Sequence, residues 1–152
     1  MKAFFIAICM LAISLKGFCQ TCEQRETQLT QAIAGLSAGL LYNTYGIIGS
    51  IADAYVKDAY KKETVDDLMD AQKNLADNLV KMLQGLVKDS ILSTETDRNY
   101  LISVISILNG LKKQAQLLQE FAQTNKQQKQ EGYDDQRKKN WSALSKLMGI
   151  KE

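Results

Sequence analysis

The sequence predicts an all-α protein, an elongated antiparallel bundle of three long helices with a short C-terminal helix. Three observations predict this fold. Apolar residues recur every three or four positions along nearly the whole chain, which is the spacing of one helix face. No stretch alternates apolar and polar residues as a half-buried strand does. The 152 residues include no proline, the residue that most strongly interrupts a long helix.

The N-terminus has the pattern of a secretory signal peptide. Lys2 precedes the 13-residue apolar run AFFIAICMLAISL, and a short polar stretch with small residues follows. The run is too short to span a membrane comfortably. Cleavage fits best after Cys19, so we expect residues 1–19 to be removed and 20–152 to form a single helical domain. The exported chain would then be periplasmic or extracellular in a bacterium.

Two cysteines, Cys19 and Cys22, form a CxxC pair at this cleavage site. A redox pair needs both sulfurs at the start of a helix packed on a sheet, and cleavage would separate these two. Neither cysteine follows the small and aliphatic residues that lipid attachment requires. Cys22 would remain as a lone thiol. In an oxidising compartment we expect it to be capped by a small thiol or to form an interchain disulfide.

Residues 22–62 form the first predicted helix. We expect one continuous helix, and the alternative is two helices joined near Asn43. The apolar positions predicted to face the bundle are Leu29, Ile33, Leu36, Leu40, Ile47, Ile51 and Tyr55.

The second predicted helix covers residues 63–90. Thr64 is placed to cap it, with Asp67 at the third position, and further acidic residues favour the positive end of the helix dipole. Its predicted buried face consists of Leu68, Gln72, Leu75, Leu79, Met82 and Leu86.

The third predicted helix covers residues 97–125 and begins after a Thr94 cap with Asp97 three residues later. Only a short connection separates it from the second helix, which favours antiparallel neighbours. Its predicted buried face consists of Leu101, Val104, Leu108, Leu111, Ala115, Leu118 and Ala122, widened by Ile105 and Phe121.

The C-terminal part is polar before it becomes amphipathic. Residues 126–136 are rich in glutamine and charge, so they are either an exposed helix extension or a linker. Residues 140–150 then predict a short helix whose shared face includes Trp141, Leu144 and Met148. Gly149 is a typical helix stop.

The charge and composition exclude several classes of function. After cleavage the chain would hold 17 basic and 17 acidic side chains, a balance that disfavours nucleic-acid binding. Residues 111–152 hold 9 basic and 5 acidic side chains, which reflects either packing of a basic tail across an acidic body or a site for an anionic partner. The sequence has no histidine, the commonest general base and metal ligand.

One short motif resembles a metal site. Asp66, Asp67 and Asp70 reproduce a DDxxD pattern, but no second acidic cluster accompanies it, and carboxylates are favoured near a helix start in any case. We therefore expect no catalytic residues, no cofactor and no metal.

The segment 27–52 is the most informative stretch for function. It has 26 residues without a charge, and its four glycines fall on one helical stripe: Gly35, Gly39, Gly46 and Gly49. Because glycine destabilises a helix, such a stripe suggests a close approach to the backbone. The approaching element is either another helix of this chain, a second copy or a membrane, although the polar residues Asn43 and Thr44 make the segment a poor membrane span.

The sequence thus predicts an exported, non-enzymatic helical-bundle protein that binds another protein or itself, for example as an accessory subunit of an envelope assembly. The predicted interaction residues are the glycine stripe with Tyr42, Tyr45 and Trp141. The alternative is a membrane-associated protein that uses residues 27–52.

Overall fold

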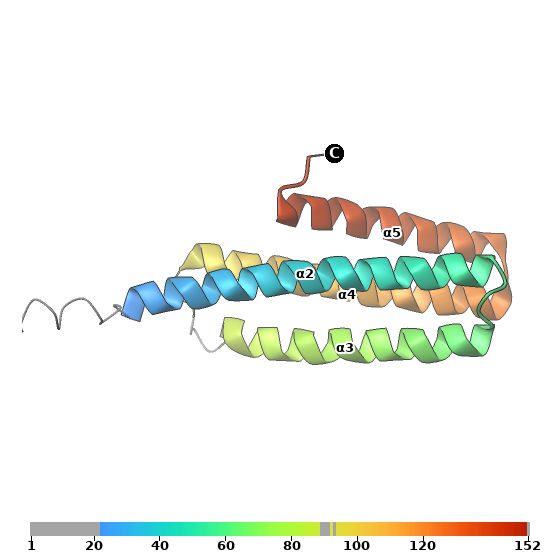
Figure 1. Ribbon diagram of the computed structural model, residues 1–152, viewed down its shortest axis with the longest axis horizontal. Coiled ribbons are helices and arrows are strands. Elements are labelled where there is room, and N and C mark those ends of the chain that lie inside the picture. Colours follow the sequence, from blue (N-terminus) through green and yellow to red (C-terminus); the bar gives the residue numbers. More distant parts are fainter. Residues whose placement is uncertain (1–21, 89–91, 93, 152) are drawn as a thin grey trace, which may run out of the picture. The chain divides into compact units, whose positions relative to one another are not determined.

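The computed structural model describes residues 22–88, 92 and 94–151 (Figure 1). These residues form four helices, α2 (Cys22–Val56), α3 (Lys62–Lys88), α4 (Glu95–Thr124) and α5 (Gln127–Met148), with no strand in the described part. The predicted all-α helical bundle is confirmed. The predicted signal peptide lies outside the described residues.

The chain divides into two compact units, residues 1–33 and 34–152. Of the first unit, residues 22–33 are described, and they are helical. Cys22 is the first residue of α2, and its side chain lies outside the described part. The bundle belongs to the second unit, which holds residues 34–56 of α2 together with α3, α4 and α5.

Helix α2 is continuous across Asn43, which confirms the prediction of one helix over two. It ends at Val56, before the expected residue 62. Asp58 adopts a left-handed conformation with φ 56°, and the amide of Ala59 donates to the carbonyl oxygen of Ala54 at 2.9 Å. This left-handed residue turns the chain towards α3.

Within the second unit, the buried stripe of α2 matches the predicted one only in part. The buried residues are Leu41, Thr44, Ile48, Gly49, Ile51 and Ala52, of which only Ile51 belongs to the predicted face. Leu36 and Ile47, predicted to be buried, are 76% and 42% exposed. The tyrosines attach this helix to α4, because the Tyr100 hydroxyl donates to the Ala34 carbonyl oxygen and the Tyr55 hydroxyl to that of Ala122.

Helix α3 packs on α4, and its buried face is also displaced from the predicted one. The buried residues are Val65, Met69, Ala76, Val80 and Leu83, whereas Leu75 and Met82 are exposed. The apolar surface of α3 is wide enough to include both the predicted and the observed stripe. Packing against α4 buries the observed one. The predicted Thr64 cap is wrong, because α3 begins at Lys62.

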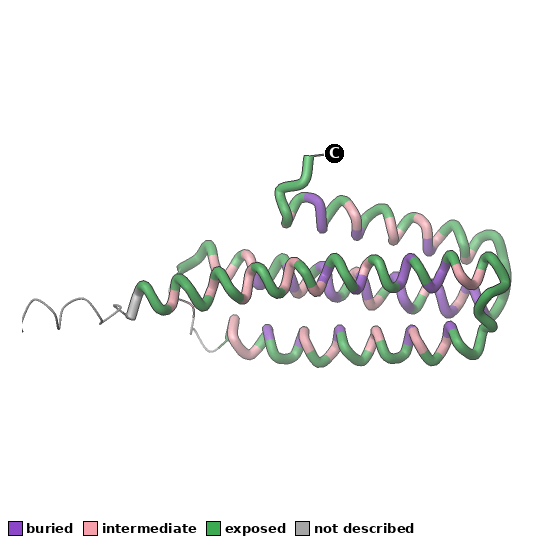
Figure 2. Tube along the Cα trace, in the orientation of Figure 1, coloured by how far each residue is buried: buried purple, intermediate pink, exposed green. Residues whose placement is uncertain are grey.

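Helix α4 agrees with its prediction in both cap and core. Thr94 accepts a hydrogen bond from the backbone amide of Asp97 at 3.1 Å. All seven predicted seam residues and Phe121 are buried, and Ile105 is half-buried. α4 contacts both α3 and α5, so much of its circumference is in the core (Figure 2).

Helix α5 corrects the prediction for the C-terminal part. All but the first residue of the polar stretch 126–136, left open as an extension or linker, belongs to one 22-residue helix that continues to Met148. A left-handed Asn125, whose amide donates to the Phe121 carbonyl oxygen, separates α5 from α4. The predicted stop at Gly149 is confirmed, with φ 67°.

A buried polar network holds α5 against α4. Asn140 donates from Nδ2 to Gln114 Oε1 at 2.8 Å and accepts from Gln136 Nε2 at 2.9 Å. The hydroxyl of Tyr133 accepts a longer bond of 3.5 Å from Gln114 Nε2. Gln114, Asn140 and Tyr133 are all buried, so α5 is attached through satisfied polar groups as well as through Leu144.

Candidate interaction surface

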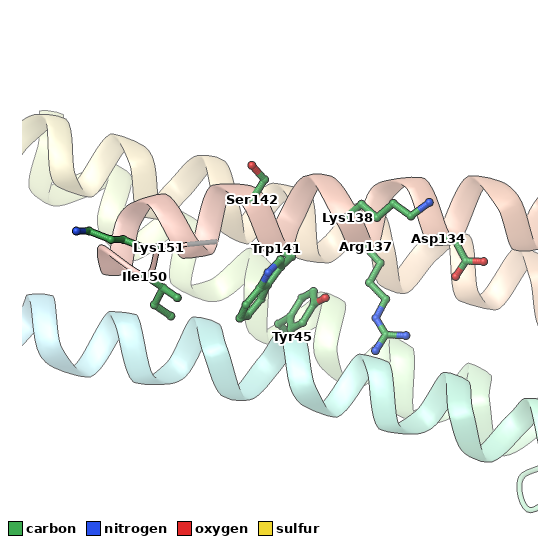
Figure 3. Close-up of a pocket in the computed structure, with 8 residues that line it drawn as sticks. All are labelled: Tyr45, Asp134, Arg137, Lys138, Trp141, Ser142, Ile150 and Lys151. Atoms are coloured by element: carbon green, nitrogen blue, oxygen red, sulfur yellow. The ribbon is translucent and has the colours of Figure 1, made fainter.

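A groove of about 730 Å³ lies between α2 and α5, within the second unit. Helix α2 contributes Tyr45 to its lining, and α5 contributes side chains from Asp134 to Ser142. Figure 3 shows Trp141 and Arg137 extending from α5 towards α2, with Tyr45 beside them. The groove is therefore formed by the facing surfaces of two helices that are far apart in the sequence.

Three aromatic side chains meet at the groove. The ring of Trp141 lies 5.6 Å from that of Tyr45 and 6.4 Å from that of Tyr42, measured between centroids. Tyr42 is 51% exposed, and Trp141 is half-buried. Stacked aromatics of this kind offer a large, rigid contact area that remains partly open to solvent.

Arg137 lies across α2 at the side of this cluster. Its guanidinium carbon is 6.0 Å from the centroid of the Tyr45 ring, and Nη1 is 3.9 Å from Asp53 Oδ1. Burial by itself lowers the pKa of Arg137, but the hydrogen bond with Tyr45 and the electrostatic effects of Tyr133, Tyr45 and Asp53 outweigh it and raise that pKa above its ordinary value. Arg137 is thus charged and held by contacts from α2.

Gly49 makes room for this arginine. A β-carbon on Gly49 would stand 3.1 Å from Arg137 Nη2, which is tighter than ordinary van der Waals contact. Gly49 is buried, so its lack of a side chain lets the guanidinium approach the α2 backbone.

The end of α5 closes one end of the groove. The left-handed Gly149 redirects the chain, and the amide of Ile150 donates to the Ser145 carbonyl oxygen at 2.9 Å. Figure 3 shows Ile150 pointing towards α2. Ile150 and the exposed Lys151 complete the lining.

The structure brings together four of the predicted interaction residues. Tyr42, Tyr45 and Trp141 form the aromatic cluster, and Gly49 lies beneath Arg137. The other three glycines, Gly35, Gly39 and Gly46, are exposed and have no neighbouring atom within 4 Å of a β-carbon position. Of the three alternatives for the stripe, close approach by another helix of this chain is seen at Gly49. At the other three glycines the described residues provide no such neighbour.

The sequence reasoning missed Asp134, Arg137 and the C-terminal pair Ile150 and Lys151. Asp134, Arg137 and Trp141 are spaced by three and four residues, so they share one face of a helix. That spacing was a usable signal, but it becomes visible only when residues 127–139 are recognised as helical.

The DDxxD motif serves the packing of α3 on α4. Asp70 Oδ1 accepts from Gln119 Nε2 at 2.9 Å and pairs with Lys73 at 2.8 Å. The hydrogen bonds from Lys73 and Gln119 lower the pKa of Asp70. Among the described residues, no group of three or more metal-binding side chains is clustered.

No described helix has a segment long and apolar enough to cross a membrane. In comparisons with known proteins, neither a family model, nor a curated protein, nor a solved structure matches this chain.

Proposed function

We propose that this protein is an exported, non-enzymatic helical bundle that acts by binding another protein through the groove between α2 and α5. The observation that carries this proposal is the half-open aromatic cluster of Tyr42, Tyr45 and Trp141 beside Arg137. Tryptophan, tyrosine and arginine are the residues most enriched at the energetic centres of protein interfaces.

Two further features support a docking surface. The groove lining combines the aromatic side chains Tyr45 and Trp141 with the cations Arg137, Lys138 and Lys151, beside Asp134 and Ser142. The apolar area around Trp141 lies on two rigid helices, which suits a preformed docking surface.

Site-specific photo-crosslinking in an exporting bacterial host tests the proposal. A photoreactive amino acid replaces Ser142, which lines the groove and is exposed. The matched control places the same group at Asn78, an exposed position on α3. We expect discrete crosslinked species from position 142 that are absent from position 78. Equal patterns at both positions would refute the groove as the binding surface.

Membrane association remains a second candidate, because α2 exposes Leu36, Tyr42 and Ile47 within the uncharged segment 27–52. Such a surface could lie on a bilayer without spanning it. Carbonate washing of isolated membranes separates the two candidates: a soluble binder, or one attached to the membrane only through another protein, is released. Retention of the chain in washed membranes would favour the second candidate.

A further inference from the structure

We infer that the groove between α2 and α5 takes an acidic segment of a partner protein. In this arrangement a partner carboxylate meets Arg137, and a neighbouring apolar side chain lies on Trp141. The inference rests on the proposed function and adds to it the chemistry of the partner.

The charge of the groove selects an acidic occupant. Its lining contains three cationic side chains, Arg137, Lys138 and Lys151, and a single acidic one, Asp134. Lys138 is 81% exposed, so it lies at the rim, where a charge steers association more than it strengthens the complex.

Arg137 is oriented for a carboxylate before any partner arrives. The bare backbone at Gly49, the ring of Tyr45 and the carboxylate of Asp53 together define its position. A guanidinium has five N–H donors in a planar fork. The Tyr45 hydroxyl and a carboxylate at 3.9 Å do not saturate this fork, which can form paired hydrogen bonds with a further carboxylate.

The apolar part of the groove requires an apolar side chain in the partner segment as well as a carboxylate. Trp141, Tyr45 and Ile150 line it next to the cations. A second hollow of about 200 Å³ shares Asp134 and Arg137 with the groove and continues to Tyr133 and Gln130 on α5. The two hollows follow α5 over several turns, which fits a stretch of polypeptide better than a small molecule.

A partner protein fits this surface better than an anionic bilayer or a nucleic acid. Two exposed acidic side chains, Asp53 and Asp135, lie close to the groove cations, at 3.9 Å from Arg137 and Lys138 respectively. Polybasic membrane or phosphate-binding surfaces concentrate several cations without such carboxylates. A peptide can place its carboxylate on Arg137 and avoid the acidic neighbours.

Selection from a random peptide library on the immobilised protein tests the inference. We expect the selected peptides to be enriched in Asp or Glu within a few residues of Leu, Phe or Trp. Trp141 is the only tryptophan of the chain, so peptides without tryptophan should change its fluorescence on binding. Titrating that fluorescence measures the dissociation constant of each selected peptide.

Matched variants identify the contribution of Arg137. Arg137→Gln should weaken binding of a selected acidic peptide by about tenfold or more. Arg137→Lys keeps the charge without the planar fork and should recover only part of the affinity. Lys139→Gln makes the same charge change at an exposed position that does not line the groove, and should alter affinity by less than about twofold. Thermal unfolding of each variant confirms that it is folded.

Several results would overturn the inference. These are a selection without acidic enrichment, one that yields no peptide sensed by Trp141, and equal effects of Arg137→Gln and Lys139→Gln. Arg137-dependent sedimentation with phosphatidylglycerol vesicles, without peptide binding, would reassign the groove to lipid.

The crosslinking experiment distinguishes a failure of the acidic-partner inference from a failure of the proposed function. A crosslink from position 142 to a neutral or basic segment of another protein would overturn the acidic partner and leave the proposed function intact. A crosslink from position 142 to a second copy of this chain would assign the groove to self-association and also overturn the acidic partner. The absence of any position-specific crosslink would remove the proposed function itself.

Discussion

The side-chain amide of Asn140 on α5 lies directly against Gly110 on α4, and its oxygen would clash with a β-carbon on residue 110. The same amide donates to the fully buried Gln114 at 2.8 Å. Because only glycine leaves this space, Gly110 and Asn140 together determine where α5 lies along α4. This position in turn brings Arg137 and Trp141 opposite α2.

Gly110→Ala should therefore destabilise the protein, although alanine favours a helix. The new methyl group displaces Asn140, and we expect a loss of about 1–3 kcal/mol in the free energy of unfolding, measured in urea. Gly85→Ala is the matched control in α3, where a β-carbon has no neighbour within 4 Å. It should stabilise by about 0.5–1 kcal/mol. Equal effects of the two substitutions would contradict the steric role of Gly110.

The hydrogen bond between Gln114 and Asn140 should contribute measurable coupling. Asn140→Ala leaves Gln114 Oε1 buried without the donor it now has, which costs about 1–3 kcal/mol. A double-mutant cycle with Gln114→Ala should give a coupling of about 0.5–3 kcal/mol in the free energy of unfolding. A coupling near zero would show that packing alone holds this part of α5.

Glu120 should make stability depend on pH in the acid range. Lys129 binds its carboxylate at 2.6 Å, and this hydrogen bond lowers the pKa of Glu120. The stabilisation is present above the pKa of the unfolded chain, about 4.3, and is lost as the pH falls through the lower folded pKa. Urea unfolding between pH 7 and 3 should show the difference between the protein and Glu120→Gln shrinking with acid. A difference that stays constant would contradict the ion pair; Lys129→Gln is the reciprocal control.

Tyr133 should make the stability of the protein depend on pH in the alkaline range. Burial raises the pKa of its hydroxyl, so the unfolded chain ionises first as the pH rises above about 10. Stability must then fall between the unfolded and the folded pKa. Tyr133→Phe removes the long bond from Gln114 and should lower stability slightly at pH 7, yet lose less stability between pH 9 and 11. Chemical denaturation at pH 9 and pH 11 measures the free energy of unfolding of both proteins. An equal loss of stability in the variant and the unsubstituted protein would contradict the prediction.

Gly49→Ala tests whether Arg137 depends on the bare α2 backbone. The added β-carbon lies 3.1 Å from Nη2, so the guanidinium must shift by a few tenths of an ångström. We expect weaker binding of an acidic peptide selected on the groove, measured through Trp141 fluorescence. Gly46→Ala, on the same stripe with open space, should leave binding unchanged and stabilise α2 by about 0.5–1 kcal/mol. Identical affinities for both variants would remove Gly49 from the site.

The buried residues are predicted correctly in a helix that other helices cover on more than one side. In α4 every seam residue from Leu101 to Ala122 is buried, because α3 and α5 both pack on this helix. In α3 the apolar arc is wider than its contact with α4. On the predicted stripe Leu75 and Met82 are exposed and the other four residues are half-buried, whereas the neighbouring stripe through Met69 and Leu83 is buried. Periodicity identifies such an arc without indicating which part of it meets a partner.

Whether the polar start of α5 is helical was ambiguous from the sequence for a related reason. Counting apolar residues does not detect a helix that is held by Tyr133, Gln136 and Asn140. These residues become core residues only through their bonds to one another and to Gln114 on the facing helix. The same limit hid Arg137, whose role depends on Gly49 and Tyr45 of α2.

The sequence by itself determined the all-α class, the Thr94 cap and the Gly149 stop. These features depend on local spacing and on single-residue backbone preferences, which act over one or two helical turns. Only the tertiary structure decided which stripe of α2 and α3 is buried and that residues 127–148 form one helix. It also decided that Tyr45, Arg137 and Trp141 meet in one groove, with Tyr42 against Trp141. Those outcomes depend on side-chain volumes and hydrogen-bond partners contributed by facing helices, and these partners are distant in the chain.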